Sequence, residues 1–190
     1  MSQSRFSPAK IAIESAAIFF SVILAFAVEQ WREDRNERQQ AAATLNLVKV
    51  ELQQNLAELE RVITSRDGQL EQFMEAIGVF KDEDVFPQNL PRLEIPEITR
   101  IAYELATDSG AVAKVDPAEL IIVARAYEAL EEVRSNERSL DERNAQIRFN
   151  DGEQYLSGFI YYLNRAQTAE PEAVVHIGQA IAVLEDDVVS

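Results

Sequence analysis

The sequence has no cysteine and only one histidine, and these shortages exclude several kinds of chemistry. Without cysteine there can be no disulfide, no thiolate nucleophile and no thiolate metal site. The single histidine, His176, follows Glu172 by four residues. A di-iron site in a helical bundle needs Glu and His three residues apart on two helices. The 6 glycines form no glycine-rich phosphate loop. We therefore predict no cofactor, no metal and no catalytic residue, and expect that the protein is not an enzyme.

Basic residues are also scarce, and their shortage is confined to one part of the chain. The net charge is −15. Residues 1–40 hold five Lys or Arg and five Asp or Glu, so residues 41–190 carry 13 basic against 28 acidic groups. A domain with this excess repels a phosphate backbone. The composition therefore predicts no nucleic-acid partner.

One long apolar stretch lies near the N-terminus and predicts a transmembrane helix over residues 11–31. No residue from Ser15 to Val28 is charged, and a helix from Ile11 to Trp31 is about 30 Å long, which matches the hydrocarbon core of a bilayer. Pro8 suits the first position of the helix, after an N-terminal tail over 1–10. Trp31 lies where an interfacial anchor belongs. The lipid bilayer is thus the first predicted partner.

Two other interpretations of this stretch exist. Ala25-Phe26-Ala27 has the small-x-small pattern of a signal-peptide cleavage site. Cleavage near Ala27 would leave a secreted helical protein. The third interpretation is a buried core helix, against which the apolar character on every side of the helix argues.

The predicted membrane helix has a face of small residues with a carboxylate at one end. At about 100° per residue, Glu14, Ala17, Ser21 and Ala25 fall on one stripe, whereas Phe19, Ile23 and Phe26 fall on the opposite one. Small residues let a second helix approach closely, and a carboxylate on this face would point at that helix rather than at lipid. Alternatively, Glu14 pairs with Lys10 and extends to the headgroups.

The helix is expected to continue beyond the membrane as a stalk over 32–80. There is no glycine or proline between Glu29 and Arg66, and Asp67-Gly68 is the predicted break. Apolar residues at three- and four-residue spacing form a predicted seam, typical of a coiled coil or helical hairpin. The seam consists of Leu45, Val48, Leu52, Leu56, Leu59 and Ile63.

A connector over 81–96 and a helical bundle over 97–190 complete the predicted organisation. The connector holds three of the six prolines and four acidic residues. A short helix is predicted from Pro96 to about Thr107, with Ile98, Ile101 and Leu105 facing inward. Asp116-Pro117 predicts a second helix start, because an N-cap precedes a proline. Further helices are predicted after Gly152 and from Pro171. No strand alternation occurs, so the predicted fold class is all-α.

Two segments resemble an uncharacterised family of bacterial single-pass membrane proteins. They are "ESAAIFFSVILAFAVEQWREDRNERQ" and "AYELATDSGAVAKVDPAELIIVARAYE". The resemblance rests on a glutamate opening an apolar helix that closes on tryptophan, and on an aromatic residue, a Ser-Gly turn and a helix bearing a tyrosine. It implies a membrane anchor with a helical domain and no known activity. The family-like positions are Glu14, Trp31, Tyr103, Gly110 and Tyr127.

These observations predict a scaffold or accessory protein of the bacterial inner membrane that acts through helix–helix contacts. Its partners would be further copies of itself or subunits of a larger membrane complex, and its C-terminal domain would lie in the periplasm, because a short N-terminal tail usually stays inside. The alternative is an anchored enzyme or small-ligand binder with tyrosines and buried carboxylates in a pocket. Otherwise the tyrosines pack the helices with their hydroxyls outward. They are Tyr103, Tyr127, Tyr155, Tyr161 and Tyr162.

Overall fold

The computed structural model describes residues 8–83, 92–146 and 152–186, which are helical or irregular and contain no strand. The side chains at 8–13, 15, 16, 82, 83, 146 and 186 lie outside this description. The predicted all-α class is confirmed. The described elements are α1 (Pro8–Ile63), α2 (Arg66–Glu83), α3 (Ile101–Asp108), the 3-10 helix η1 (Ala111–Lys114), α4 (Pro117–Gln146) and α5 (Gly152–Asp186).

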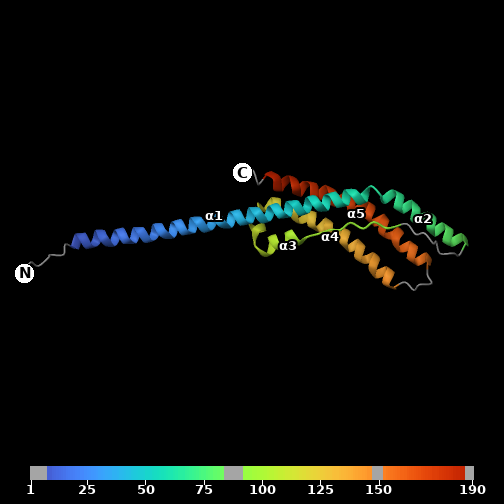
Figure 1. Cartoon of the computed structure of the whole chain (residues 1–190), viewed down its shortest axis with the longest axis horizontal. Coiled ribbons are helices and arrows are strands. Elements are labelled where there is room, and N and C mark those ends of the chain that lie inside the picture. Colours follow the sequence, from blue (N-terminus) through green and yellow to red (C-terminus); the bar gives the residue numbers. More distant parts are fainter. Residues whose placement is uncertain (1–7, 84–91, 147–151, 187–190) are drawn as a thin grey trace, which may run out of the picture.

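Helix α1 is a single rod of 56 residues. It begins at Pro8, as predicted, and continues through the charged run after Trp31 without a break. Figure 1 shows its N-terminal half projecting away from the remaining helices, which gather around its C-terminal half. We call those gathered helices, together with α1 from Ala41 onward, the body. The prediction that the apolar segment and the stalk form one helix is confirmed.

Within the part of the chain that the structure describes, no helix has a stretch long and apolar enough to cross a membrane. The predicted span over 11–31 falls partly outside the described side chains, because positions 11–13, 15 and 16 are among those left out. Its described part consists of Glu14 and residues 17–31.

The break between α1 and α2 lies at Thr64 and Ser65, not at Asp67-Gly68, where it was predicted. The Thr64 hydroxyl donates to the carbonyl of Arg61 at 2.7 Å, and the Ser65 hydroxyl donates to the carbonyl of Val62 at 2.8 Å. These side chains occupy carbonyls at the C-terminal end of α1. The helix therefore ends without a glycine or proline.

The connector runs on to Arg100, so that α3 begins later than the predicted Pro96. Residues 92–100 have no regular secondary structure, and 84–91 lie outside the described residues. Two of the three residues expected to face inward are exposed, since Ile101 is 74% and Leu105 50% exposed. The buried residue of α3 is Ala106.

Helix α4 starts at Pro117, as the sequence indicates. The Asp116 carboxylate accepts a hydrogen bond from the backbone N–H of Ala118 at 2.8 Å, which caps the helix. Before it, Gly110 has a φ of 73°, the left-handed conformation that glycine adopts without strain. This turn joins α3 to η1.

Helix α5 passes through Pro171, and the prediction that this proline opens a separate helix is wrong. The proline lies inside a continuous helix of 35 residues. Proline removes one backbone hydrogen bond, but Pro171 is exposed, so water can solvate the freed carbonyl. The buried stripe of α5 keeps its three- and four-residue spacing across the proline. It consists of Leu156, Leu163, Ala166, Glu170, Ala173, Ile177, Ala180 and Leu184.

The core has two clusters arranged along α5. The larger cluster packs α1 against α3, α4 and the C-terminal half of α5, and the smaller one packs α2 against α4 and the N-terminal half of α5. The predicted stalk seam lies in the larger cluster. Val48, Leu52 and Leu59 are buried, whereas Leu45, Leu56 and Ile63 are partly buried. The seam is therefore covered by the chain's own helices. The spacing of the apolar residues cannot distinguish this packing from packing against another chain.

Candidate functional site

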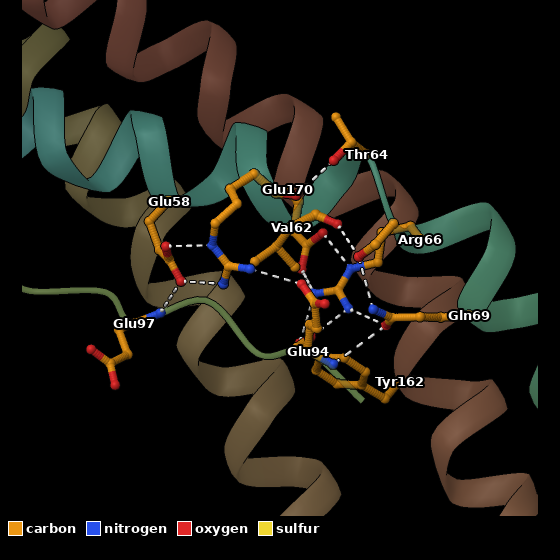
Figure 2. Close-up of polar contacts among 11 residues, drawn as sticks. Glu58, Val62, Thr64, Arg66, Gln69, Glu94, Glu97, Tyr162 and Glu170 are labelled. Atoms are coloured by element: carbon orange, nitrogen blue, oxygen red, sulfur yellow. Dashed lines mark hydrogen bonds and ion pairs between the residues drawn. The ribbon is translucent and has the colours of Figure 1, made fainter. Parts of the chain in front are cut away.

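A buried cluster of polar side chains lies where α1 ends and α2 begins. Figure 2 shows the guanidinium of Arg66 enclosed by α5, α2 and the connector. Its Nε donates to the Glu170 carboxylate at 2.8 Å, and an Nη donates to the other oxygen of the same carboxylate. Further bonds reach the Gln69 side chain at 3.1 Å, the Glu94 carbonyl at 2.6 Å and the Tyr162 hydroxyl at 3.3 Å. Arg66 is thus saturated by groups from three segments.

The charges in this cluster neutralise each other. The Arg66 and Glu170 side chains are 3% and 1% exposed. Burial is the largest single effect on Arg66 and by itself lowers its pKa, but the hydrogen bonds and charge interactions with Glu170 and Tyr162 together outweigh it and the pKa is raised. Burial raises the pKa of Tyr162 to about 12. The cluster therefore consists of an ion pair and a neutral phenol.

A second cluster centres on Glu51 of α1. One carboxylate oxygen accepts from the Tyr127 hydroxyl at 2.7 Å, and the other accepts from the backbone N–H of Ala102 at 2.8 Å. The Tyr103 N–H lies 3.3 Å from the first oxygen. The rings of Tyr103 and Tyr127 stack with their centroids 4.0 Å apart. Glu51 therefore occupies the N-terminal end of α3, where a negative charge is favourable.

Between the two clusters, Asn55 fixes the connector to α1. Its amide donates to the Thr99 carbonyl at 2.8 Å and accepts from the Thr99 N–H at 3.0 Å. Asn55 is 2% exposed. Buried side chains of α1 and α2 thus hold an irregular segment at three successive points, the Glu94 carbonyl, Thr99 and the start of α3.

These clusters correct the expectation for the tyrosines. Tyr127 and Tyr162 are 5% and 1% exposed, and their hydroxyls point inward to Glu51 and Arg66. Their partners, Glu51 and Arg66, are themselves buried in the core. Among residues 8–83, 92–146 and 152–186, no group of three or more His, Asp or Glu could hold a metal ion. We infer that the clusters fix the shape of the body.

The polar cluster residues carry a sequence signal that the prediction did not use. Each lies at a three- or four-residue step along an otherwise apolar stripe: Asn55 lies between Leu52 and Leu59, and Glu170 between Ala166 and Ala173. A polar residue at such a position must be buried with a partner. Its partner was not predictable, because Arg66 and Glu170 are 104 residues apart.

The described residues of the predicted membrane helix lie on the projecting part of α1, and no other element in the described part of the chain covers them. Glu14, Ala17, Ser21 and Ala25 are exposed, and the Ser21 hydroxyl donates to the Ala17 carbonyl at 2.8 Å. Trp31 is 60% exposed, with the Arg35 guanidinium 5.6 Å from its ring centroid. Large apolar side chains between 47% and 71% exposed surround this part of the helix. They are Ile18, Phe19, Phe20, Val22, Ile23, Leu24, Phe26 and Val28.

A groove between α4 and α5, which includes His176, is a candidate site for a small ligand. It is lined by Arg125, Glu128, Ala129, Glu132, Ala169, Glu172 and His176. His176 lies 3.9 Å from Glu172. None of the five tyrosines lines this groove, so it differs from the tyrosine pocket that the sequence suggested.

Comparison of the chain with protein-family models, curated proteins and solved structures finds no match.

Proposed function

We propose that the protein is a membrane-anchored scaffold or accessory protein that acts through helix–helix contacts. The observation that carries the proposal is the exposed apolar surface of α1 between Ile18 and Trp31. Nine large apolar side chains in this segment, Trp31 included, are at least 47% exposed, and no other element of the described chain packs on them. Soluble proteins rarely leave so much contiguous apolar surface in water.

A bilayer accounts for the distribution of these side chains around the helix. Ile18, Phe19 and Phe20 lie on different sides at about 100° per residue, and all three are exposed, which is typical of a helix surrounded by lipid. The stretch extends in sequence from Ile11 to Trp31. With lipid around it, the polar clusters and charged surfaces of the body would lie outside the membrane.

The continuous α1 suits a scaffold because it joins the apolar segment to the body without a flexible link. The buried polar clusters around Arg66 and Glu51 have their hydrogen-bond partners within the chain. A protein partner would therefore bind to the outer surface of the body. The partners we propose are membrane lipid together with further copies of the chain or subunits of a membrane complex. The proposed location is the bacterial inner membrane with the body in the periplasm, in accord with the resemblance to single-pass bacterial proteins.

Membrane extraction of the full chain tests the anchor. The wild-type protein should resist alkaline extraction and have its full mass. Ile23→Arg places a charge at the centre of the apolar stretch, which costs about 3 kcal/mol of insertion free energy, so a large fraction should become extractable. Ala57→Arg on the exposed side of the same helix is the matched control and should stay in the membrane.

Either of two results would refute the anchor. Wild-type protein that is fully extracted at alkaline pH would show that lipid does not surround α1. A mature protein that lacks residues 1–27 would show that the segment is cleaved as a signal peptide.

A further inference from the structure

We propose that two copies of the chain associate side by side in parallel, through the face of α1 that is turned away from the body. This inference rests on the proposed anchor, because the membrane holds both copies in the same direction. It names a second copy as the partner and assigns the contact to one stripe of residues, which we call the free face. The free face consists of Glu14, Ala17, Ser21, Ala25, Val28, Arg32, Arg35, Gln39, Ala43, Asn46, Val50, Gln53 and Ala57.

The burial of α1 defines the free face within the body. Ala41, Val48, Leu52 and Leu59 are at most 8% exposed and face the core. The exposed residues of the same segment include Ala43, Val50 and Ala57, which lie on the opposite side of the helix. At about 100° per residue, the centre of this exposed side is about 180° from the centre of the buried one.

Because α1 is continuous, the orientation of the free face can be followed down into the apolar segment. Ala25 precedes Ala43 by 18 residues, which is about five full turns of an α-helix. The two residues therefore lie on the same side of the rod. Ser21 and Ala17 lie beside this line about one and two turns below Ala25, and Phe19, Ile23 and Phe26 lie on the side that bears the body. Small residues and the body are thus on opposite sides of one helix.

This arrangement allows two copies to approach without collision of their bodies. Close approach of membrane helices requires small residues at the contact, and these lie where the body does not. The contact can continue upward past Ala43 and Val50 to Ala57, all of which are exposed. A helix contact from Glu14 to Ala57 would be about 65 Å long and about 10 Å wide. It would cover about 650 Å² of each copy, close to the 800 Å² per partner of a standard interface.

The charges on α1 favour a second copy of this chain as the partner. In a parallel pair each residue lies beside its own copy, so a contact face must carry few charges of one sign. The chain has a net charge of −15, yet no free-face residue from Ala17 to Ala57 is acidic. Glu29, Glu33, Asp34 and Glu37 all lie outside the stripe. The basic residues in that stretch are Arg32 and Arg35. Arg32 follows Glu29 by three residues, which places a neutralising carboxylate beside it, and the Arg35 guanidinium lies 5.6 Å from the ring centroid of Trp31.

Cysteine cross-linking in membranes tests this assignment, and the absence of native cysteine makes each introduced thiol unique. Single variants Gln39→Cys and Ala43→Cys place the thiol on the free face. Asp34→Cys and Arg38→Cys place it on exposed positions of the same rod that face other directions. After oxidation, the free-face variants should give at least five times more disulfide-linked dimer than the two controls.

A bulky substitution in the apolar segment provides the second test. Ala25→Phe should reduce cross-linking at Ala43→Cys at least five-fold, because it separates the two rods. Ile23→Phe adds a ring on the other side of the helix and should leave cross-linking unchanged.

Alkaline extraction of every variant separates the two proposals. If the chain is extracted, the anchor fails. If it stays in the membrane but the four cysteines give equal amounts of dimer, or none, the parallel pair is refuted while the anchor stands. Dimer formation that is highest at Asp34→Cys or Arg38→Cys would likewise refute the free face, because the contact would lie on another side of α1.

Discussion

Replacement of Glu170 by glutamine should destabilise the body strongly, because it leaves the Arg66 charge buried without a counter-charge. Two charge-assisted hydrogen bonds join these residues, and each is worth about 1.5–3 kcal/mol. Arg66 keeps its bonds to Gln69, Tyr162 and the Glu94 carbonyl, which offsets part of the loss. Breaking a buried pair by removing one partner costs about 3–5 kcal/mol. We expect Glu170→Gln to lower the free energy of unfolding by about 3 kcal/mol.

Urea unfolding of the full chain in mild detergent, followed by circular dichroism at 222 nm, would measure this change. Glu172→Gln is the matched control: its side chain is 61% exposed and 3.9 Å from His176, so the loss should stay below about 0.5 kcal/mol. A double variant with methionine at 66 and leucine at 170 removes both charges and should recover most of the stability. A Glu170→Gln loss below about 1 kcal/mol, or no larger than that of the control, would refute the reasoning.

Three further predictions concern single residues. The folded-state pKa of Tyr162 is raised from 10.0 to about 12. The protonated phenol therefore contributes about 3 kcal/mol to the free energy of unfolding, which is present below pH 10 and lost between pH 10 and 12. In urea titrations, Tyr162→Phe should remove this part of the stability loss at alkaline pH. Gly110→Ala meets no atom within 4 Å but has a φ of 73°, so it should lower the melting temperature through about 1 kcal/mol of backbone strain, whereas Gly178→Ala, inside α5, should raise it. Asn55→Leu should accelerate amide exchange at Thr99 at least ten-fold without affecting α4, because it removes both bonds to the connector; unchanged exchange would contradict the role of Asn55.

The elements that local chemistry determines were predictable from the sequence. Pro8 and Asp116-Pro117 mark helix starts because proline fits the first turn and an aspartate caps it. The length of α1 followed from the absence of glycine and proline. Its end did not, since Thr64 and Ser65 stop the helix with hydroxyl bonds to preceding carbonyls, and such residues also occur inside helices. Pro171 misled the prediction because a proline on the exposed side of a well-packed helix is tolerated.

Tertiary pairing accounts for what the sequence could not predict at the candidate site. Nothing near Glu51 indicates that it caps α3 from another helix, since its partners lie 51 to 76 residues away. The seam from Leu45 to Ile63 was correctly placed on one side of the helix, but periodicity does not tell whether the covering helix belongs to the same chain. In contrast, helical geometry alone predicted that Glu14, Ala17, Ser21 and Ala25 share one side of the helix. The buried residues of α1 in the body now show that this side faces away from the body.

The exposed stretch of α1 between Trp31 and Ala41 has an electrostatic consequence. Ten residues of helix span about 15 Å, so with Trp31 at the membrane interface, as we propose, the core of the body begins about 15 Å from the headgroups. The basic Lys114 reaches closer, because it pairs with Glu37 at 3.4 Å. Screening in physiological salt has a decay length of about 8 Å. The acidic excess of residues 41–190 would therefore be nearly two screening lengths from anionic lipid. A strongly negative domain can then remain close to a negative membrane with little repulsion, and shortening this stretch by two turns would bring the two charges within one screening length.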